Sequence, residues 1–444
     1  MAKVTREKKS AQPVSSSLAG NRQAEATMRD ARYDVIVVGG GSAGVAAAVG
    51  AANTGAKVLL VEAYGFLGGA ATLSQVLAWC GFFPQQQGTV PDAVVAGIGR
   101  QALNHLADLG LDVRPYFSAT GNWPIRLNPE ATKIALDRTV GATDTCVALH
   151  TTLVSVSVSN GRLGALRLSD RRGTREVCAE TYVDATGDAV LAFLAGASPC
   201  PLYPIGAGVQ PASYPVRISG VGPDVSLDKT LRGQAFSGIH RRYGCAELRA
   251  DGGLITTLPG TGDLWWLGIE VETNGLDGED LAQAERDGRE LAWRGVELFR
   301  QQIPGFESAN VASTGPRIGI RETRHAATVA PLLEPLLTGG IRPADTVALG
   351  AWPMELHHGP GQTEYRRIGG SGIYGIPLGA LRSRDFTNLF QAGRTLGADP
   401  AAYASARVMG TSFATGHAAG IAAALKDQGV LAIQGELRRQ DALL

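Results

Sequence analysis

The sequence predicts an α/β protein with a parallel sheet and an antiparallel meander, joined to a mixed α+β second domain. Three observations predict this class. Tyr33–Val38 is a β-branched run followed by a glycine-rich turn, a small-residue helix at 43–54 and a second apolar run at 57–62, which together make one βαβ unit. Apolar residues alternate between 152 and 183, with Asn-Gly and Arg-Gly turns between them. Beyond residue 200, proline, glycine and short strands dominate.

The length and the composition exclude several classes of protein. A chain of 444 residues is too long for one ordinary core. Lys plus Arg equals Asp plus Glu at 41 each, so no basic balance supports nucleic-acid binding. The five cysteines are scattered with no CxxC spacing. They therefore predict neither a disulfide framework nor a metal centre, and they fit reduced thiols in a cytoplasmic protein.

The two ends of the chain differ in character. Residues 1–32 are polar and carry no apolar signal-peptide core, which predicts a disordered tail. The most apolar segment, 401–425, contains Arg407 and His417 among many small residues. This composition predicts a tightly packed helix rather than a membrane span.

Further elements follow along the chain. Helices are expected at 93–109 and at 129–140, where Asn128 and Pro129 form the start. Between 200 and 374, one helix is expected at 280–302. A buried strand returns at 389–392, before the small-residue helical segment. The sequence therefore predicts a discontinuous cofactor domain, 33–200 and 375–444, around a substrate domain at 201–374.

A phosphate-binding turn joins the first strand to the first helix. Gly39, Gly41 and Gly44 occupy the three slots of GxGxxG. They permit a tight turn, close approach of the backbone to a pyrophosphate, and close packing of helix on strand. Glu62 ends the next strand, where a carboxylate can accept a hydrogen bond from a ribose hydroxyl. Strand, turn, helix and acid together indicate a dinucleotide site.

Three further stretches carry a family resemblance. Gly65–Thr72 follows Glu62 and contains a second pair of glycines. Val183–Asp188 and Asn388–Arg394 flank later strands. With Gly319–Arg324, these stretches resemble FAD-dependent oxidoreductases of the glutathione-reductase-like fold, in particular the broad bacterial FAD-dependent oxidoreductase subgroup. The resemblance implies a Rossmann-like FAD-binding domain and non-covalent FAD.

The resemblance also implies individual FAD contacts. The implied FAD-binding residues are Gly39, Gly41, Ser42, Ala43, Gly44, Glu62, Gly68, Gly69, Ala70, Thr72, Leu153, Val154, Gly187, Gly393, Arg394, Thr411 and Ser412. In this reading the helix that begins near Thr411 and Ser412 directs its N-terminus at the pyrimidine edge of the flavin, where its dipole stabilises the reduced form.

Two features depart from better-known members of the fold. Residues 66–79 contain no histidine, so covalent attachment of flavin there is not expected. No second GxGxxG lies between a strand and a helix, so no built-in NAD(P)H domain is expected. The electrons are therefore expected to pass to an external acceptor, namely oxygen, a quinone or another protein.

Candidate catalytic residues are few. Arg321, Arg324 and His325 lie within seven residues and could clamp a carboxylate and move a proton, or could form a structural ion-pair network. His357 and His358 lie in a glycine- and proline-rich loop. They could carry a proton, or they could merely be exposed side chains. Arg407 precedes the last long helix, where an arginine must be paired or face a ligand.

The leading hypothesis is a dehydrogenase or oxidase that transfers a hydride between non-covalent FAD and a small, for example carboxylated, molecule. One alternative is fumarate-reductase-like chemistry at a C=C bond. Another, of a different class, is a flavin-binding electron-transfer or assembly subunit without a substrate. We expect a small-molecule substrate, no nucleic acid, no metal and no membrane span, and the oligomeric state stays open.

Overall fold

The computed structural model describes residues 32–118, 120–203, 208–222, 225, 227, 229–243, 247–426 and 428–444. The predicted tail lies outside the described residues except for Arg32, which opens the first strand. Among the described helices, none combines the length and the hydrophobicity that a bilayer crossing needs.

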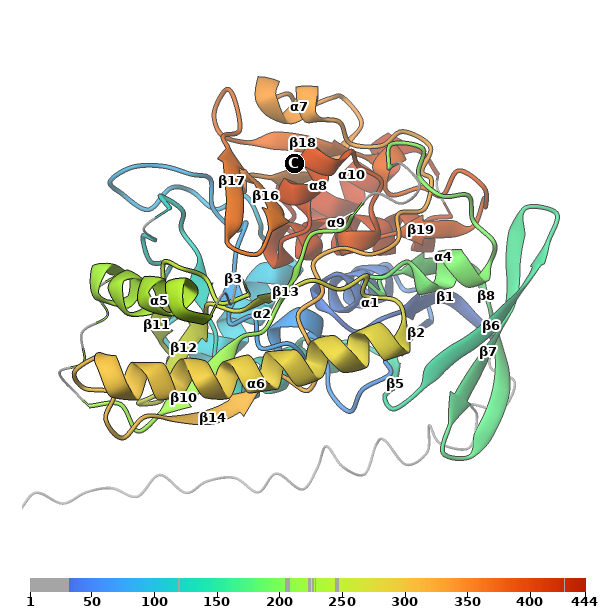
Figure 1. Cartoon of the computed structure of the whole chain (residues 1–444). Coiled ribbons are helices and arrows are strands. Elements are labelled where there is room, and N and C mark those ends of the chain that lie inside the picture. The colour runs from blue at the N-terminus through green and yellow to red at the C-terminus, as the bar shows by residue number, and fades with distance from the viewer. Residues whose placement is uncertain are drawn as a thin grey trace, which may run out of the picture.

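A parallel sheet forms the centre of the molecule (Figure 1). Its parallel strands lie in the order β5–β2–β1–β8, with β19 on the far side of β8. The strands are β1 (Arg32–Val38), β2 (Val58–Val61), β5 (Cys146–Ala148), β8 (Gly173–Asp184) and β19 (Leu389–Gln391). The α/β class is confirmed, and the predicted β1–α1–β2 unit forms where the buried apolar runs placed it.

The same sheet continues into the predicted meander. β6 (Thr152–Ser159) and β7 (Arg162–Asp170) pair antiparallel, and β7 pairs with the first half of β8. The second half of β8 pairs parallel with β1. β8 is therefore long because it serves both the arm that projects from the body in Figure 1 and the buried sheet.

Two helices of small residues cross in close contact beneath the sheet. They are α1 (Ser42–Ala52) and α9 (Met409–Ala424). A Cβ added at Gly416 would lie 2.1 Å from the carbonyl oxygen of Ala43, and one at Gly420 would lie 2.0 Å from that of Ala47. The two backbones touch, so only glycine fits at these positions. This contact explains why 401–425 is apolar without being a membrane segment.

The helices differ from expectation in several places. The helix predicted at 93–109 is α2 (Ile98–Asp108), and Gly97 precedes it with a left-handed φ of 54°. The segment 401–425 is two helices, since Val408 is extended between them. Four helices were not predicted: the short α4 and α7, α5, which lacks apolar periodicity, and α10. The remaining helices are α3 (Pro129–Gly141), α4 (Val190–Leu194), α5 (Lys229–Tyr243), α6 (Gly278–Gln302), α7 (Glu334–Gly339), α8 (Pro400–Ala406) and α10 (Val430–Arg439).

A second layer lies along α6 (Figure 1). Its antiparallel sheet has the order β11–β12–β10–β14, formed by β10 (Val216–Ser219), β11 (Leu254–Thr257), β12 (Leu264–Leu267) and β14 (Asn310–Thr314). Most buried apolar residues between 212 and 320 form their own cluster, although Leu258 and Trp265 pack in the cluster that contains α1 and α9. Buried residues between 332 and 381 instead pack in the cluster that contains α1 and α9. The limits predicted for the two domains stay a prediction.

Four short pairs complete the strands. They are β3 (Ala78–Trp79) with β4 (Ile125–Arg126), β9 (Ala212–Ser213) with β13 (Glu270–Val271), β15 (Thr346–Gly350) with β18 (Tyr374–Pro377), and β16 (Met354–Gly359) with β17 (Gln362–Arg366). An isolated bridge between Gly41 and Gly68 joins the glycine-rich turn to the loop after β2.

Candidate functional site

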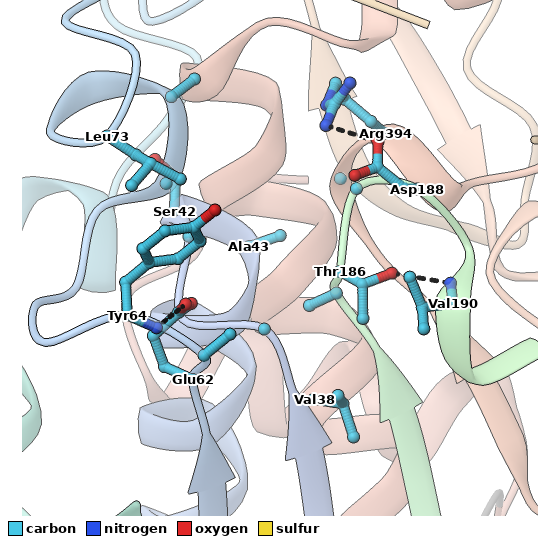
Figure 2. Close-up of a pocket in the computed structure, with 18 of the residues that line it drawn as sticks. Val38, Ser42, Ala43, Glu62, Tyr64, Leu73, Thr186, Asp188, Val190 and Arg394 are labelled. Carbon is cyan, nitrogen blue, oxygen red and sulfur yellow. Dashed lines mark hydrogen bonds and ion pairs between the residues drawn. The ribbon is translucent and has the colours of Figure 1, made fainter. Parts of the chain in front are cut away.

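A cavity of about 270 Å³ opens at the carboxyl ends of β1, β2 and β8 (Figure 2). Val38, Val61 and Ala185 mark those ends in its wall. The carboxyl edge of a parallel sheet is where open α/β folds bind ligands. The cavity continues past Gly393 to Arg407 and Met409, so it runs from β2 to the start of α9.

The glycine-rich turn forms the floor of the cavity. Gly39 has φ of 99°, and a Cβ on it would lie 2.4 Å from the carbonyl oxygen of Ala185. A Cβ on Gly44 would lie 1.7 Å from the carbonyl oxygen of Gly39. Gly41 differs, because its Cβ would meet only the Cα of Gly69, at 3.7 Å. The fold therefore requires glycine at positions 39 and 44. At position 41 the protein itself leaves room for a side chain, which would point into the cavity.

The N-terminus of α1 faces the cavity without a cap. Gly41 is the N-cap residue, and no side chain accepts a hydrogen bond from this end of the helix. The Oγ of Ser42 is buried and has no hydrogen-bond partner among the described residues, although Ser42 and Ala43 line the cavity. Buried hydroxyls are normally paired. Unpaired donors at the positive end of a helix dipole form an anion-binding surface.

Glu62 lies at one end of the cavity, where both of its carboxylate oxygens are held by backbone. Gly40 N donates to Oε2 at 2.6 Å and Tyr64 N donates to Oε1 at 2.9 Å. Burial raises the pKa of this carboxyl, against the effect of the two N–H groups. The two hydrogen bonds fix its orientation toward the ligand space seen beside Ser42 in Figure 2.

The loop after β2 and the start of α9 form the opposite end. Gly68 and Gly69 have positive φ values of 119° and 53°, which let the loop turn back over Gly41. The hydroxyl of Thr72 donates to the carbonyl of Leu67 at 2.8 Å and so braces this loop from behind. Ser412, in the first turns of α9, lines the cavity.

Most of the residues predicted for the cofactor meet in this cavity. Those that line it are Gly39, Gly41, Ser42, Ala43, Glu62, Gly68, Gly69, Ala70, Leu153, Gly187, Gly393, Arg394 and Ser412. Gly44, Thr72, Val154 and Thr411 do not. Val154 points outward and is 45 % exposed, because successive residues of a strand face opposite sides. The predicted helix start near Thr411 is wrong by two residues, since α9 begins at Met409.

Sequence reasoning missed a charged cluster on the cavity wall. Asp188 follows β8, and its carboxylate pairs with Arg317 at 2.8 Å and with Arg394 at 3.2 Å. Burial raises the pKa of Asp188, but the charges of Arg394 and Arg317 outweigh it and hold the pKa below its ordinary value. Asp188 belongs to the Asp-Ala-Thr-Gly-Asp motif already identified, so the sequence held a signal for it. Arg317 belongs to no motif that would have indicated a role in the site.

Of the six predicted catalytic residues, only Arg407 lines the cavity. Its Nη2 donates to the carbonyl of Glu355 at 3.1 Å and lies 3.5 Å from Oε1 of Gln210, while its buried Nε has no partner. Within the part of the chain that the structure describes, Arg407 forms no ion pair with a carboxylate. The structure thus gives this cavity one arginine that is not neutralised by direct contact with an acid.

Arg321 and His357 meet in a buried cluster behind Arg407. Nη2 of Arg321 lies 2.9 Å from Oε1 of Glu270. Nδ1 of His357 lies 3.0 Å from the same oxygen, and its Nε2 lies 3.4 Å from Oε1 of Glu355. The imidazole of His357 thus lies between the carboxylates of Glu270 and Glu355.

The other three predicted catalytic residues do not line the cavity. Arg324 stacks over Phe193 at 4.0 Å, and its Nη1 donates to the carbonyl of the lining residue Asp188 at 3.4 Å. His325 is buried between the rings of Tyr203 and Tyr403, and its Nε2 lies 2.9 Å from Glu322. His358 is exposed on the β16–β17 hairpin, 2.9 Å from Glu364. Their contacts fit the structural alternative, and their catalytic role stays a prediction.

Comparison with known proteins adds the family. Residues 34–435 match the model of the family described as FAD dependent oxidoreductase. Among solved structures, the chain is similar to a geranylgeranyl bacteriochlorophyll reductase-like protein from Thermoplasma acidophilum (13 % identity, TM-score 0.44, covering 93 % of this chain and 83 % of that one). It is also similar to p-nitrophenol 4-monooxygenase from Pseudomonas putida DLL-E4 (12 % identity, TM-score 0.46, covering 92 % of this chain and 84 % of that one). No curated protein sequence matches it. Because the family match spans nearly the whole described chain, this protein belongs to the FAD-dependent oxidoreductase family.

Proposed function

We propose that this FAD-dependent oxidoreductase transfers a hydride between a small, carboxylated substrate and non-covalent FAD. The single observation that carries the proposal is the cavity that joins the glycine-rich turn to Arg407. FAD, when bound, supplies the two-electron acceptor or donor. The chain supplies the binding surface, an arginine that forms no direct ion pair among the described residues, and a buried cluster of ionisable side chains.

The residues of the cavity fit an extended dinucleotide. We assign the pyrophosphate to Gly39–Gly44 and the N-terminus of α1, because Ser42 offers an unpaired buried hydroxyl there. We assign the adenosine ribose to Glu62 and the ribityl chain and flavin to Gly68–Ala70 and Gly393–Arg394. The N-terminus of α9 then lies at the pyrimidine edge, where its dipole favours negative charge.

The Glu62 assignment predicts a loss of affinity in Glu62→Gln. Both oxygens accept a backbone N–H, so the amide of glutamine would place one donor against another. We expect FAD to bind about tenfold more weakly, from about 1.5 kcal/mol lost. In the wild type, affinity should fall as the pH drops through the raised pKa of Glu62, because the carboxylate is the better acceptor for a ribose hydroxyl. Equilibrium titration by flavin fluorescence measures both. An unchanged affinity in Glu62→Gln would contradict the assignment.

The proposed binding site for the substrate carboxylate depends on Arg407. The other two arginines of the cavity, Arg317 and Arg394, share the charge of Asp188. Among the described residues, the hydrogen-bond acceptors of Arg407 are the neutral oxygens of Gln210 and of the Glu355 backbone, and its buried Nε has no partner there. A substrate carboxylate would satisfy this guanidinium with a charge-assisted hydrogen bond. Arg407 would then hold the substrate beside the flavin end of the cavity.

The cluster behind Arg407 places ionisable side chains close to the proposed substrate site. Burial raises the pKa of Glu270, but the hydrogen bond from His357 and the charge of Arg321 lower it to about 2. The pKa of Glu355 is likewise lowered, because His357 and Arg407 outweigh its burial. Both acids therefore stay ionised at neutral pH, with His357 between them. Glu355 joins this cluster to Arg407 through its backbone carbonyl.

The test is anaerobic reduction of the purified holoprotein. A panel of small carboxylic acids and their uncharged analogues is added without oxygen, and loss of the oxidised flavin spectrum is followed. We expect bleaching by a carboxylated member and none by its amide. Re-oxidation by oxygen or a quinone then identifies the acceptor. Bleaching only by uncharged compounds would overturn the carboxylate proposal. A flavin that no substrate reduces, but that a protein partner does, would favour the electron-transfer subunit.

A further inference from the structure

The carboxylate of Asp188 holds two arginines on the wall of the cofactor cavity. Its Oδ2 lies 2.8 Å from Nη2 of Arg317, and its Oδ1 lies 3.2 Å from Nη2 of Arg394. The hydroxyl of Thr323 donates to the same Oδ1 at 3.1 Å. Both carboxylate oxygens are therefore occupied, and all three charged residues line the cavity. Asp188, Arg317 and Arg394 are called the Asp188 cluster below.

Backbone contacts hold both arginines in place. Nη1 of Arg394 donates to the carbonyl of Ile320 at 2.7 Å. Gly187 has φ of 80°, and a Cβ on it would overlap Nη2 of Arg394, so the turn leaves room for this guanidinium. The backbone N of Arg317 donates to the carbonyl of Leu73 at 3.3 Å. The Asp188 cluster is therefore built into the cavity wall and is not a chance pairing of surface side chains.

The Asp188 cluster lies beside the segments that we assign to the ribityl chain and the flavin. Arg394 directly follows Gly393, which belongs to that assignment. Leu73, which contacts the backbone of Arg317, belongs to the same loop as Gly68–Ala70, the other part of the assignment. Figure 2 shows Arg394 on one side of the cavity and Leu73 on the other. A flavin bound between these segments would lie next to the cluster.

The Asp188 cluster carries one net positive charge, because two guanidinium groups share one carboxylate. Among the described residues, no second acid forms an ion pair with Arg317 or Arg394. The three side chains are between 10 % and 28 % exposed, so salt and water screen their charges less than those of surface groups. The net charge therefore acts on a ligand that lies beside it in the cavity.

We propose that the Asp188 cluster raises the reduction potential of the bound flavin and so favours hydride transfer from the substrate to FAD. Reduction of FAD by two electrons and one proton adds one negative charge to the flavin. A fixed positive charge beside the ring stabilises this product relative to the oxidised form. The inference rests on the proposed placement of FAD, but it needs no assumption about the substrate.

The test is the midpoint potential of the flavin in the holoprotein, measured anaerobically against reference dyes without any substrate. Asp188→Asn leaves two net positive charges in the cluster and should raise the potential. Arg317→Gln leaves no net charge and should lower it. We expect each change to alter the equilibrium constant for reduction about tenfold, which is about 30 mV for a two-electron couple. Arg317→Lys keeps the charge and should stay near the wild-type potential.

A double variant distinguishes an effect of charge from damage to the fold. Asp188→Asn combined with Arg317→Gln again leaves one positive charge, so its potential should return toward the wild-type value. Loss of packing would instead move both single variants in one direction and move the double variant further. The matched control is Arg294→Gln, which removes an exposed positive charge from α6 and should leave the potential unchanged.

Shifts of the same sign in Asp188→Asn and Arg317→Gln, or wild-type potentials in both, would overturn the inference. Should Asp188→Asn fail to fold or to retain FAD, the comparison of Arg317→Gln with Arg317→Lys decides, because equal potentials in these two variants would also contradict it. If the potentials respond as expected but no small acid reduces the flavin, the substrate proposal alone fails. If an acid reduces the flavin but the potentials do not respond, this inference alone fails.

Discussion

Replacement of Gly41 by alanine should give a folded protein that has lost FAD. Gly41 has φ of −71° and ψ of −175°, an extended conformation that any residue adopts. The new methyl would meet only the Cα of Gly69, at 3.7 Å, so the apoprotein accommodates it. The methyl would instead stand in the cavity where the backbone approaches the pyrophosphate. Overpacking of about 3 kcal/mol corresponds to about 100-fold weaker binding, which titration of the apoprotein with FAD would measure.

Substitutions at two other glycines serve as comparisons for this prediction. Gly44→Ala should lower the thermal stability of the apoprotein itself, because its Cβ would overlap the carbonyl oxygen of Gly39. Gly435→Ala is the neutral control, since a Cβ there meets nothing within 4 Å and the residue lies in α10. It should bind FAD normally and unfold at the same temperature or slightly above. If Gly41→Ala bound FAD as tightly as this control, the turn would not be the pyrophosphate site.

The sequence carried enough information for the parallel sheet because its strands are buried on both faces. Residues 35–38 of β1 and all of β2 are buried runs of Val, Ile and Leu, and such runs need no tertiary context to be identified. The glycine-rich turn could be located for a similar reason, since steric contact with Ala185 and Gly39 leaves no alternative to glycine. The interruption at Val408 was harder to locate, because no proline marks it and Gly410, a poor helix former, lies inside the second helix.

The charged part of the site was less visible in the sequence. Tyr64, Asp188 and Arg317 reach the cavity from three separate segments, and each residue type is common on surfaces. The cluster of Arg321, Arg324 and His325 looked stronger because its charges are adjacent in sequence. In the structure these three side chains diverge, toward Glu270, Phe193 and Glu322 respectively. Adjacency in an irregular segment does not determine a common direction, whereas strand and helix periodicity does.

Arg407→Met should leave FAD bound and largely abolish reduction by a carboxylated substrate. Methionine keeps the bulk of the aliphatic stem but removes the guanidinium, so the substrate carboxylate would be desolvated without a partner. Loss of one member of a buried charge pair costs about 2–4 kcal/mol, or about 30- to 1,000-fold in the rate of anaerobic flavin reduction at low substrate. The same variant should reduce discrimination between the acid and its amide, because neither would find a cation. Stopped-flow absorbance measures both quantities.

The controls for Arg407 decide whether it binds substrate or supports the fold. Arg407 also donates to the carbonyl of Glu355, so its loss could loosen β16 and the cluster of His357 behind it. Arg407→Lys keeps a cation while losing the fork; if the arginine binds a carboxylate, lysine should restore part of the rate and the preference for the acid. A purely structural role would lower the melting temperature and slow the acid and the amide equally. Equal slowing of both in Arg407→Met, with no recovery in Arg407→Lys, would therefore remove the carboxylate from the mechanism while leaving the FAD site intact.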